Sequence, residues 1–268
     1  MKKKIYVVGT YTNYASWIND AELVGNISSA DIILFTGGED VSPTLYGCKK
    51  HPTTMCNPER DNYEKNIFSK IKANQLCLGI CRGSQFLCVM NGGKLVQNCD
   101  NHGIWGTHPI SFANNMQYEI TSTHHQMQYP YCLNPSEYKL LAVANQPTNP
   151  LGTVFEGDKI KSDFIRIFGE PEIVLYTQPK KPKCLAIQGH PEMMRPTSPT
   201  IKMLNELLDR ILIGNDPASL PTKKDTESLS PVGDFDPFSM YGVRAVAADE
   251  DIMAKVERDL RGRLGMRL

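Results

Sequence analysis

The sequence has little of three features that would indicate a charged partner or a membrane. Its 29 basic residues balance its 29 acidic residues, so no basic field is present to attract nucleic acid or an anionic membrane. No apolar run approaches the length of a transmembrane helix. The run 5–8, behind three lysines, is too short for a signal peptide. We therefore expect a cytoplasmic protein with no nucleic-acid or membrane partner.

The chain also lacks a CxxC pair, although it has eight cysteines. Cys77, Cys81 and Cys88 lie close together, but no histidine falls at ligand spacing beside them, so no metal site is expected. Buried reduced thiols are the better interpretation for most of the cysteines. The sequence leaves a redox-active disulfide open.

The composition divides the chain into two parts. At 268 residues, with 41% hydrophobic and 22% charged residues, it is long enough for one large globular domain with an extension. We expect a catalytic domain over 1–213 and a linker with a helical extension over 214–268. Residues 216–239 are rich in Pro, Ser, Asp and Gly, which is typical of a linker. A helix expected at 249–261 either packs on its own domain or docks a partner.

Alternating apolar strands and amphipathic helices predict an α/β fold, with a mostly parallel sheet and helices on both faces. Strands are expected at 5–9, 31–35 and 76–79, and helices at 60–75, 83–91 and 200–212. The middle of the chain has shorter extended runs, at 118–123, 139–144, 152–155, 164–168 and 172–176. These runs predict a small antiparallel β portion.

The most informative motif is Gly79–Gln85, in which Cys81 has a glycine two positions before it and another two positions after it. Apolar runs on both sides predict a strand, a sharp turn and a helix, the pattern of a nucleophile elbow. The glycines fit because such a turn is strained and crowded. The elbow would place the sulfur at a helix N-terminus, which favours the thiolate. Taken alone, the motif also fits a buried cysteine in an ordinary turn.

A second segment, Gln188–Glu192, follows another apolar run and could supply the base that a cysteine nucleophile needs. His190 can take the thiol proton, and Glu192 can hold the imidazole in one tautomer. Pro191 restricts the backbone between them. Alone this segment fits a solvated loop, but together with the cysteine elbow it favours a Cys–His–Glu site.

Four segments, in this order along the chain, resemble the class I glutamine amidotransferases. Within that family the resemblance is to the γ-glutamyl hydrolases, especially the γ-glutamyl-γ-aminobutyrate hydrolase type. The segments are Thr36–Gly47 with its Gly-Gly-x-Asp-Val-x-Pro signature, Arg60-Asp61 followed by Glu64, the elbow Gly79–Gln85 continued by Gly92–Gln97, and Gln188–Glu192. Ser122–Gln126 also looks like the family's substrate-side Ser-x-His loop. The resemblance covers residues 5–213.

The resemblance implies a doubly wound, flavodoxin-like sheet and a triad of Cys81, His190 and Glu192 that acts on a γ-glutamyl amide. Cys81 would form a γ-glutamyl thioester, with His190 relaying the proton to the leaving amine and then activating water. Backbone N–H groups of Arg82 and of Gly37 or Gly38 would hold the oxyanion. No cofactor is expected.

Several other polar residues are interpreted either as substrate-binding groups or as structural groups. Four are candidates to hold the α-amino and α-carboxylate groups of the glutamyl moiety: Gln85, Ser122, His124 and Gln126. Each could equally be an ordinary loop or cap residue, and His125 could be relevant in place of its neighbour. The other histidines are interpreted as structural or surface groups: His51, His102 and His108.

Three functions remain to be weighed. The first is a free-standing hydrolase of glutamine or a γ-glutamyl amine. The second is a glutaminase subunit that delivers ammonia to a separate synthetase partner, with the C-terminal helix as the place for that partner or for self-association. The third is an inactive scaffold, which the intact Cys, His and Glu pattern disfavours.

The sequence also departs from the family, because the short polar stretch 13–29 predicts an abbreviated first crossover that could open one sheet edge.

Overall fold

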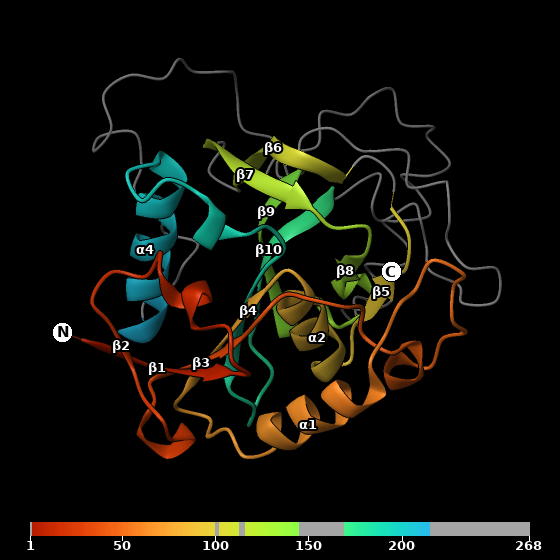
Figure 1. Cartoon of the computed structure of the whole chain (residues 1–268), viewed down its shortest axis with the longest axis horizontal. Helices are drawn as coiled ribbons and strands as arrows, with labels where there is room; N and C mark the ends of the chain where they lie inside the picture. The colour runs from red at the N-terminus through yellow and green to blue at the C-terminus, as the bar shows by residue number, and fades with distance from the viewer. Residues whose placement is uncertain (1, 100–101, 113–115, 145–168, 215–268) are drawn as a thin grey trace, which may run out of the picture.

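The computed structural model describes residues 2–99, 102–112, 116–144 and 169–214, and its centre is one nine-stranded sheet (Figure 1). In spatial order the strands are β2 (Ala21–Leu23), β1 (Lys3–Val8), β3 (Ile32–Phe35), β4 (Leu76–Ile80), β11 (Lys183–Ile187), β10 (Glu170–Tyr176), β9 (Tyr138–Ala144), β6 (Gly103–Phe112) and β7 (Gln117–Thr123). The strands from β2 to β11 pair in parallel, and those from β10 to β7 extend the sheet as an antiparallel arm. The predicted α/β class is confirmed.

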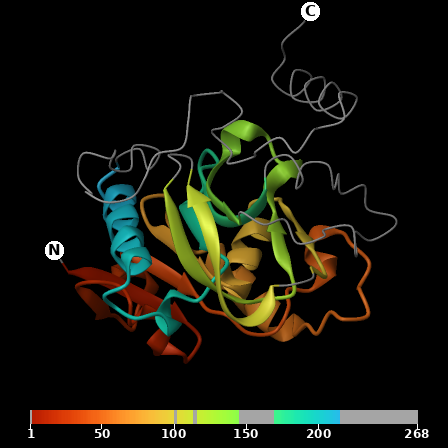
Figure 2. The same cartoon turned by 90° about the horizontal axis from the view of Figure 1, so that it is seen from above.

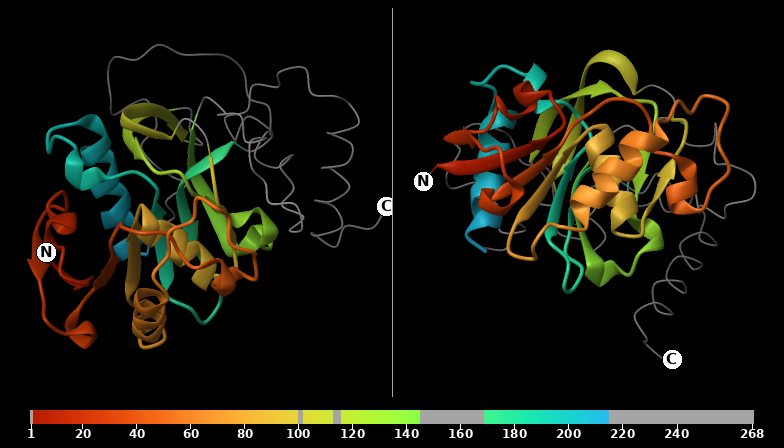
Figure 3. Two further views of the ribbon diagram at one scale, coloured as in Figure 1. Left: turned by 45° about the vertical axis from the view of Figure 1, so that its right-hand side comes forward. Right: turned by 60° about the horizontal axis from the view of Figure 1, so that its bottom comes forward.

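Helices cover both faces of the sheet. Helices α1 (Pro58–Phe68) and α2 (Arg82–Met90) lie on one face, and α4 (Pro199–Leu212) lies on the other (Figures 2 and 3). Strand β3 shows why its sequence does not alternate. Ile32 and Leu34 pack in the cluster of α4, whereas Ile33 and Phe35 pack in the cluster of α2, and all four are fully buried.

Helix α1 begins at Pro58, close to the start expected at residue 60, but ends earlier than expected. The Asn57 side chain accepts hydrogen bonds from the first turn, and Pro58 follows at the first helical position. The prediction that the helix continues to Gln75 is wrong, because the helix ends at Phe68. The Gln75 amide turns inward and donates to the carbonyls of Ile27 and Ala30, both at 2.7 Å. This tertiary contact leads the chain directly into β4.

The first crossover is short, as expected. It consists of two single-turn 3₁₀ helices, Thr12–Ala15 and Ile27–Ser29, on either side of β2. Strand β2 pairs with β1 over three residues, Lys3 to Ile5, and so covers the start of β1 at this edge of the sheet. The crossover brings Tyr14 toward the carboxyl ends of the parallel strands, where it lies beside His190.

Some elements were missed by the sequence patterns, and some predictions cannot be compared. Strand β6 was missed because it is largely exposed and contains two glycines and a proline. A small second sheet of β5 (Lys94–Val96) and β8 (Met127–Tyr129) was also missed. The runs predicted at 152–155 and 164–168, and the extension beyond residue 214, lie outside the described residues. Within the described part of the chain, none of the helices combines the length and apolar character needed to cross a membrane.

Candidate active site

Cys81 lies in a strained turn between β4 and α2. Its backbone has φ 52° and ψ −110°, a region that residues with a side chain rarely adopt. A Cβ on Gly79 would meet the backbone of Gly83, and one on Gly83 would meet the Phe35 carbonyl, so neither position has room for a side chain. The Cys81 carbonyl accepts from Ser84 N–H at 2.9 Å, which begins α2 directly after the cysteine. The local geometry is that of the predicted elbow.

The neighbouring strand brings His190 to Cys81. Strands β4 and β11 are parallel and in register up to Ile80 and Ile187, so the segments that follow them leave the same edge of the sheet. The His190 N–H donates to Thr121 Oγ1 at 2.6 Å, and its ring Nδ1 lies 2.7 Å from Glu192 Oε1. The Cys81 side chain is also close enough to the ring to raise its pKa. The structure therefore brings the three predicted triad residues together.

The electrostatics of His190 favour its protonated form. Burial lowers the pKa of His190, but hydrogen bonds to Cys81 and Glu192 and the charges of both groups outweigh it and raise the pKa to about 10. Cys81 itself is 8% exposed, so little water screens the pair. A protonated imidazole at neutral pH is the neighbour that stabilises a cysteine thiolate.

The glycine turn after β3 packs closely against this pair. A Cβ on Gly37 would lie 3.1 Å from His190 Cε1 and 2.7 Å from the Tyr14 hydroxyl oxygen. Gly38 has φ +135°, and a Cβ there would collide with the Arg60 guanidinium. That guanidinium donates to the Gly37 carbonyl at 2.9 Å, which holds the turn in place. The predicted oxyanion loop is therefore next to the His190 ring.

A buried ion network connects the glycine turn to the elbow. Arg82, 1% exposed, donates to Asp61 Oδ1 at 2.5 Å and to Glu64. Glu64 also accepts from Arg60 Nε at 2.8 Å, and Asp61 Oδ2 accepts from the Ser42 N–H at 3.0 Å. The Arg-Asp motif thus links α1 both to the residue after Cys81 and to the glycine loop, a role that its sequence pattern did not reveal.

The four predicted substrate-binding residues lie together but are all buried. Gln85 Nε2 donates to the Gln126 carbonyl at 2.9 Å, and the His124 ring bonds to the same carbonyl at 2.9 Å. Ser122 Oγ donates to the His102 carbonyl at 2.7 Å, and Gln126 Nε2 donates to Thr54 at 3.1 Å. Each side chain therefore has an internal partner. The half-buried His125 instead lies 3.0 Å from Asp40 Oδ1.

Sequence reasoning missed two groups near this site. One is Tyr14, whose ring centroid is 6.0 Å from that of His190 and whose pKa is raised to about 12, by burial first and then by the charges of Glu192 and Cys81. The other is a buried cluster around Glu172 that includes His102, 1% exposed, which was expected to be structural or at the surface. Two glutamates, Glu170 and Glu172, inside the apolar strand β10 were the available signal, because buried carboxylates require partners.

Comparisons with known proteins show what this chain is similar to. A family model described as Peptidase C26 matches residues 15–136, which include Cys81 and the glycine turn. Protein NtpR of Enterococcus hirae is 26% identical over 180 residues, covering 65% of this chain and 72% of that protein. A putative glutamine amidotransferase-like protein of Lactococcus lactis subsp. lactis, YvdE, is 30% identical over 170 residues, covering 62% of this chain and 67% of that protein.

Among solved structures, a glutamine amidotransferase from Thermotoga maritima superimposes with a TM-score of 0.43 at 12% identity, covering 81% of this chain and 87% of that one. The sequence similarity to the Lactococcus protein establishes the family, because the match covers 67% of that relative at 30% identity. The chain belongs to the glutamine amidotransferase-like family.

Proposed function

We propose that this protein hydrolyses a γ-glutamyl amide, either glutamine or a γ-glutamyl amine, through a γ-glutamyl thioester on Cys81. The observation that carries the proposal is the position of the His190 ring at the edge of the sheet, where it is hydrogen-bonded to Glu192 and close enough to Cys81 for that group to raise its pKa. Membership of the glutamine amidotransferase-like family supports cysteine-dependent cleavage of an amide bond. The γ-glutamyl specificity rests on the sequence resemblance.

In the first half-reaction the Cys81 thiolate attacks the amide carbonyl carbon, and the carbonyl electron pair moves onto oxygen. Collapse of this intermediate breaks the C–N bond, and the leaving nitrogen takes a proton from His190. Ammonia or an amine departs, and the acyl group stays on sulfur as a thioester. Glu192 stabilises the imidazolium and fixes the tautomer that presents Nε2 to the reacting atoms.

In the second half-reaction water attacks the thioester carbonyl while the now neutral His190 accepts its proton. Collapse breaks the C–S bond, which releases glutamate and returns the thiolate and the imidazolium. Both intermediates carry negative charge on the former carbonyl oxygen. Backbone N–H groups of Arg82 and of Gly37 or Gly38 are the proposed donors, because the ion network already connects these two segments.

The proposal predicts release of glutamate by the full-length chain from glutamine or from one of a panel of γ-glutamyl amines. Replacing Cys81 with Ala should lower turnover by about a thousandfold or more, because no other group can form the thioester. Cys132→Ser is the matched control, since that thiol is exposed and should leave turnover unchanged. Unchanged turnover in Cys81→Ala, or no glutamate from any substrate of the panel, would contradict the proposal.

A further inference from the structure

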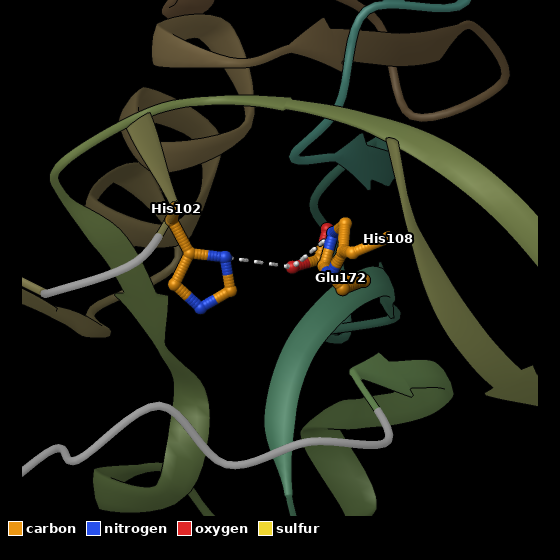
Figure 4. Close-up of side chains that lie close together, drawn as sticks. All are labelled: His102, His108 and Glu172. Carbon is orange, nitrogen blue, oxygen red and sulfur yellow. Dashed lines mark ion pairs between the residues drawn. The ribbon is translucent and has the colours of Figure 1, made fainter. Parts of the chain in front are cut away.

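Three histidine rings approach one buried carboxylate in the antiparallel arm of the sheet. Glu172 Oε1 lies 3.9 Å from His102 Nδ1, 3.4 Å from His108 Nε2 and 3.7 Å from His124 Nε2. Figure 4 shows His102 and His108 each turning a ring nitrogen toward Glu172. We refer to these four residues as the histidine cluster. They come from β6 and its start, the end of β7, and β10.

The cluster is largely buried, and four of its inward-facing atoms have no hydrogen-bond partner among the described residues. Glu172 is 0% exposed, and the side chains of His102 and His124 are 1% and 2% exposed. Within the described part of the chain, both carboxylate oxygens of Glu172 and the Nε2 atoms of His108 and His124 lack a hydrogen bond. Native proteins rarely leave a buried carboxylate without partners, because its desolvation is then uncompensated.

The outward-facing nitrogens of two rings already have hydrogen-bond partners, and these partners determine whether the inner nitrogens of the neutral rings carry a proton. His102 Nε2 lies 2.9 Å from Glu170 Oε2, and His124 Nδ1 lies 2.9 Å from the Gln126 carbonyl oxygen. Both partners only accept, so each neutral ring has its proton on the outer nitrogen and a lone pair inside. Ser122 Oγ, 3.3 Å from His102 Nδ1, gives its proton to the His102 carbonyl instead. In their neutral forms these two rings therefore direct lone pairs toward the carboxylate, an arrangement that a bound metal cation would satisfy.

We propose that the histidine cluster binds one divalent first-row transition metal ion, of which zinc is the best fit. Three of its ligands are Nδ1 of His102, Nε2 of His108 and the Glu172 carboxylate, whose ligand atoms all lie within 4.8 Å of one another. The fourth is Nε2 of His124, which lies outside that group but 3.7 Å from Glu172 Oε1 and moves inward on binding. In a tetrahedral site with bonds of about 2.0–2.2 Å, neighbouring ligand atoms are about 3.3–3.6 Å apart, which the approaches to Glu172 match with small adjustments. Imidazole with one carboxylate suits zinc, and Glu170 is the outer carboxylate that usually orients a ligating histidine.

This metal is structural, since four protein ligands fill the coordination sphere and none of them is a proposed catalytic group. It joins β6 and the end of β7 to β10. Thr121 of β7 holds the His190 backbone, and β10 pairs with β11, which leads to His190, so the metal steadies the strands that position this histidine. His124 then serves as a metal ligand in place of the substrate-binding role expected from the sequence.

The first test uses the wild-type full-length chain, stripped with a chelator and titrated separately with Zn²⁺ and Co²⁺. We expect one ion per chain, bound in a saturable step, and a cobalt spectrum with d–d bands of nitrogen and oxygen ligation. The eight cysteine thiols are the competing ligands, and cobalt bound to them would show thiolate charge-transfer absorption. No stoichiometric binding, or a thiolate spectrum, would overturn the proposal.

Variants then assign the ligands independently of activity. His108→Ala and Glu172→Gln should abolish stoichiometric binding, and Glu170→Gln should weaken it about 10–100-fold through loss of the outer bond to His102. His51→Ala, a histidine outside the cluster, is the matched control and should bind zinc like the wild type. Equal affinity in all four variants contradicts the assignment. If a ligand variant fails to fold, Glu170→Gln and the wild-type cobalt spectrum decide.

Discussion

At the scale of single residues, interactions with Cys81 and Glu192 raise the pKa of His190 far above its ordinary value. Its folded-state pKa of about 10 lies above the ordinary value of 6.5. The folded protein therefore keeps this proton over a range of pH in which the unfolded chain has lost it. The stability that protonated His190 contributes is complete below pH 6.5 and is lost as the pH rises through about 10.

The corresponding measurement is urea unfolding of the wild type and of His190→Asn, below pH 6.5 and above pH 10. The difference in free energy of unfolding between the two proteins should shrink at the higher pH, because the variant has no imidazole to titrate. In Cys81→Ala the pH dependence should be weaker, since the hydrogen bond to Cys81 is one of the causes of the raised pKa. The same difference at both pH values would contradict the pKa that we assign.

Gly38 offers a second prediction at this scale. Replacing it with Ala should lower the free energy of unfolding by about 1–3 kcal/mol, because the residue would keep a φ of +135° that disfavours side chains. The added methyl would also meet the Arg60 guanidinium and displace the proposed oxyanion loop, so turnover should fall about tenfold or more. Gly25→Ala is the control, since no atom lies within 4 Å of its Cβ position. Wild-type turnover in Gly38→Ala would argue against an oxyanion role for this turn.

At the scale of elements, the network between α1 and α2 carries the largest expected loss of stability. Glu64→Gln would leave the fully buried Arg82 with one carboxylate partner fewer, and breaking a buried ion pair in this way costs about 3–5 kcal/mol. Glu59→Gln on the same helix is the control, because its side chain is exposed. Urea unfolding measures both variants. Equal losses would mean that the network does not hold the two helices together.

The same elements show what sequence patterns can predict and what they miss. The strand and helix on either side of Cys81 were predicted because the constraint is local: two glycines and two apolar runs lie within a few residues. The end of α1 was not, because it depends on a hydrogen bond from Gln75 to Ala30, far away in the sequence. Helix ends set by tertiary contacts leave little trace in the local pattern.

At the scale of the whole molecule, the proposed triad and the histidine cluster differ in how far the sequence predicts them. Cys81 and His190 could be paired from sequence because a cysteine nucleophile needs a base and each residue follows a recognisable apolar run. In the structure these runs are the parallel strands β4 and β11, whose carboxyl ends lie together. The histidine cluster could not be paired in this way, because His102 and Glu172 meet only through the antiparallel order β10-β9-β6-β7. That order follows from pairings between distant segments, which no periodicity encodes.

The segment beyond residue 214 supplies none of the groups that the proposed reaction uses. Every proposed catalytic group precedes residue 214, and the closing helix α4 packs Leu204, Leu207 and Leu208 into the main core with no exposed area. A chain of residues 1–214 keeps this packing and should therefore fold as one cooperative unit. It should release glutamate within about twofold of the full-length rate. A glutaminase subunit would behave differently, with activity that rises when a synthetase partner binds the segment 215–268.

The two alternatives separate when light scattering is combined with glutamate release for the full-length chain and for residues 1–214. Equal turnover with monomers in both cases supports a free-standing hydrolase. A full-length chain that co-purifies with a partner, and whose glutaminase activity falls to the level of the shorter chain when that partner is removed, supports the ammonia-delivering role. Because Cys132→Ser should match the wild type in both backgrounds, a change confined to the truncated chain reports on the missing segment rather than on thiol chemistry.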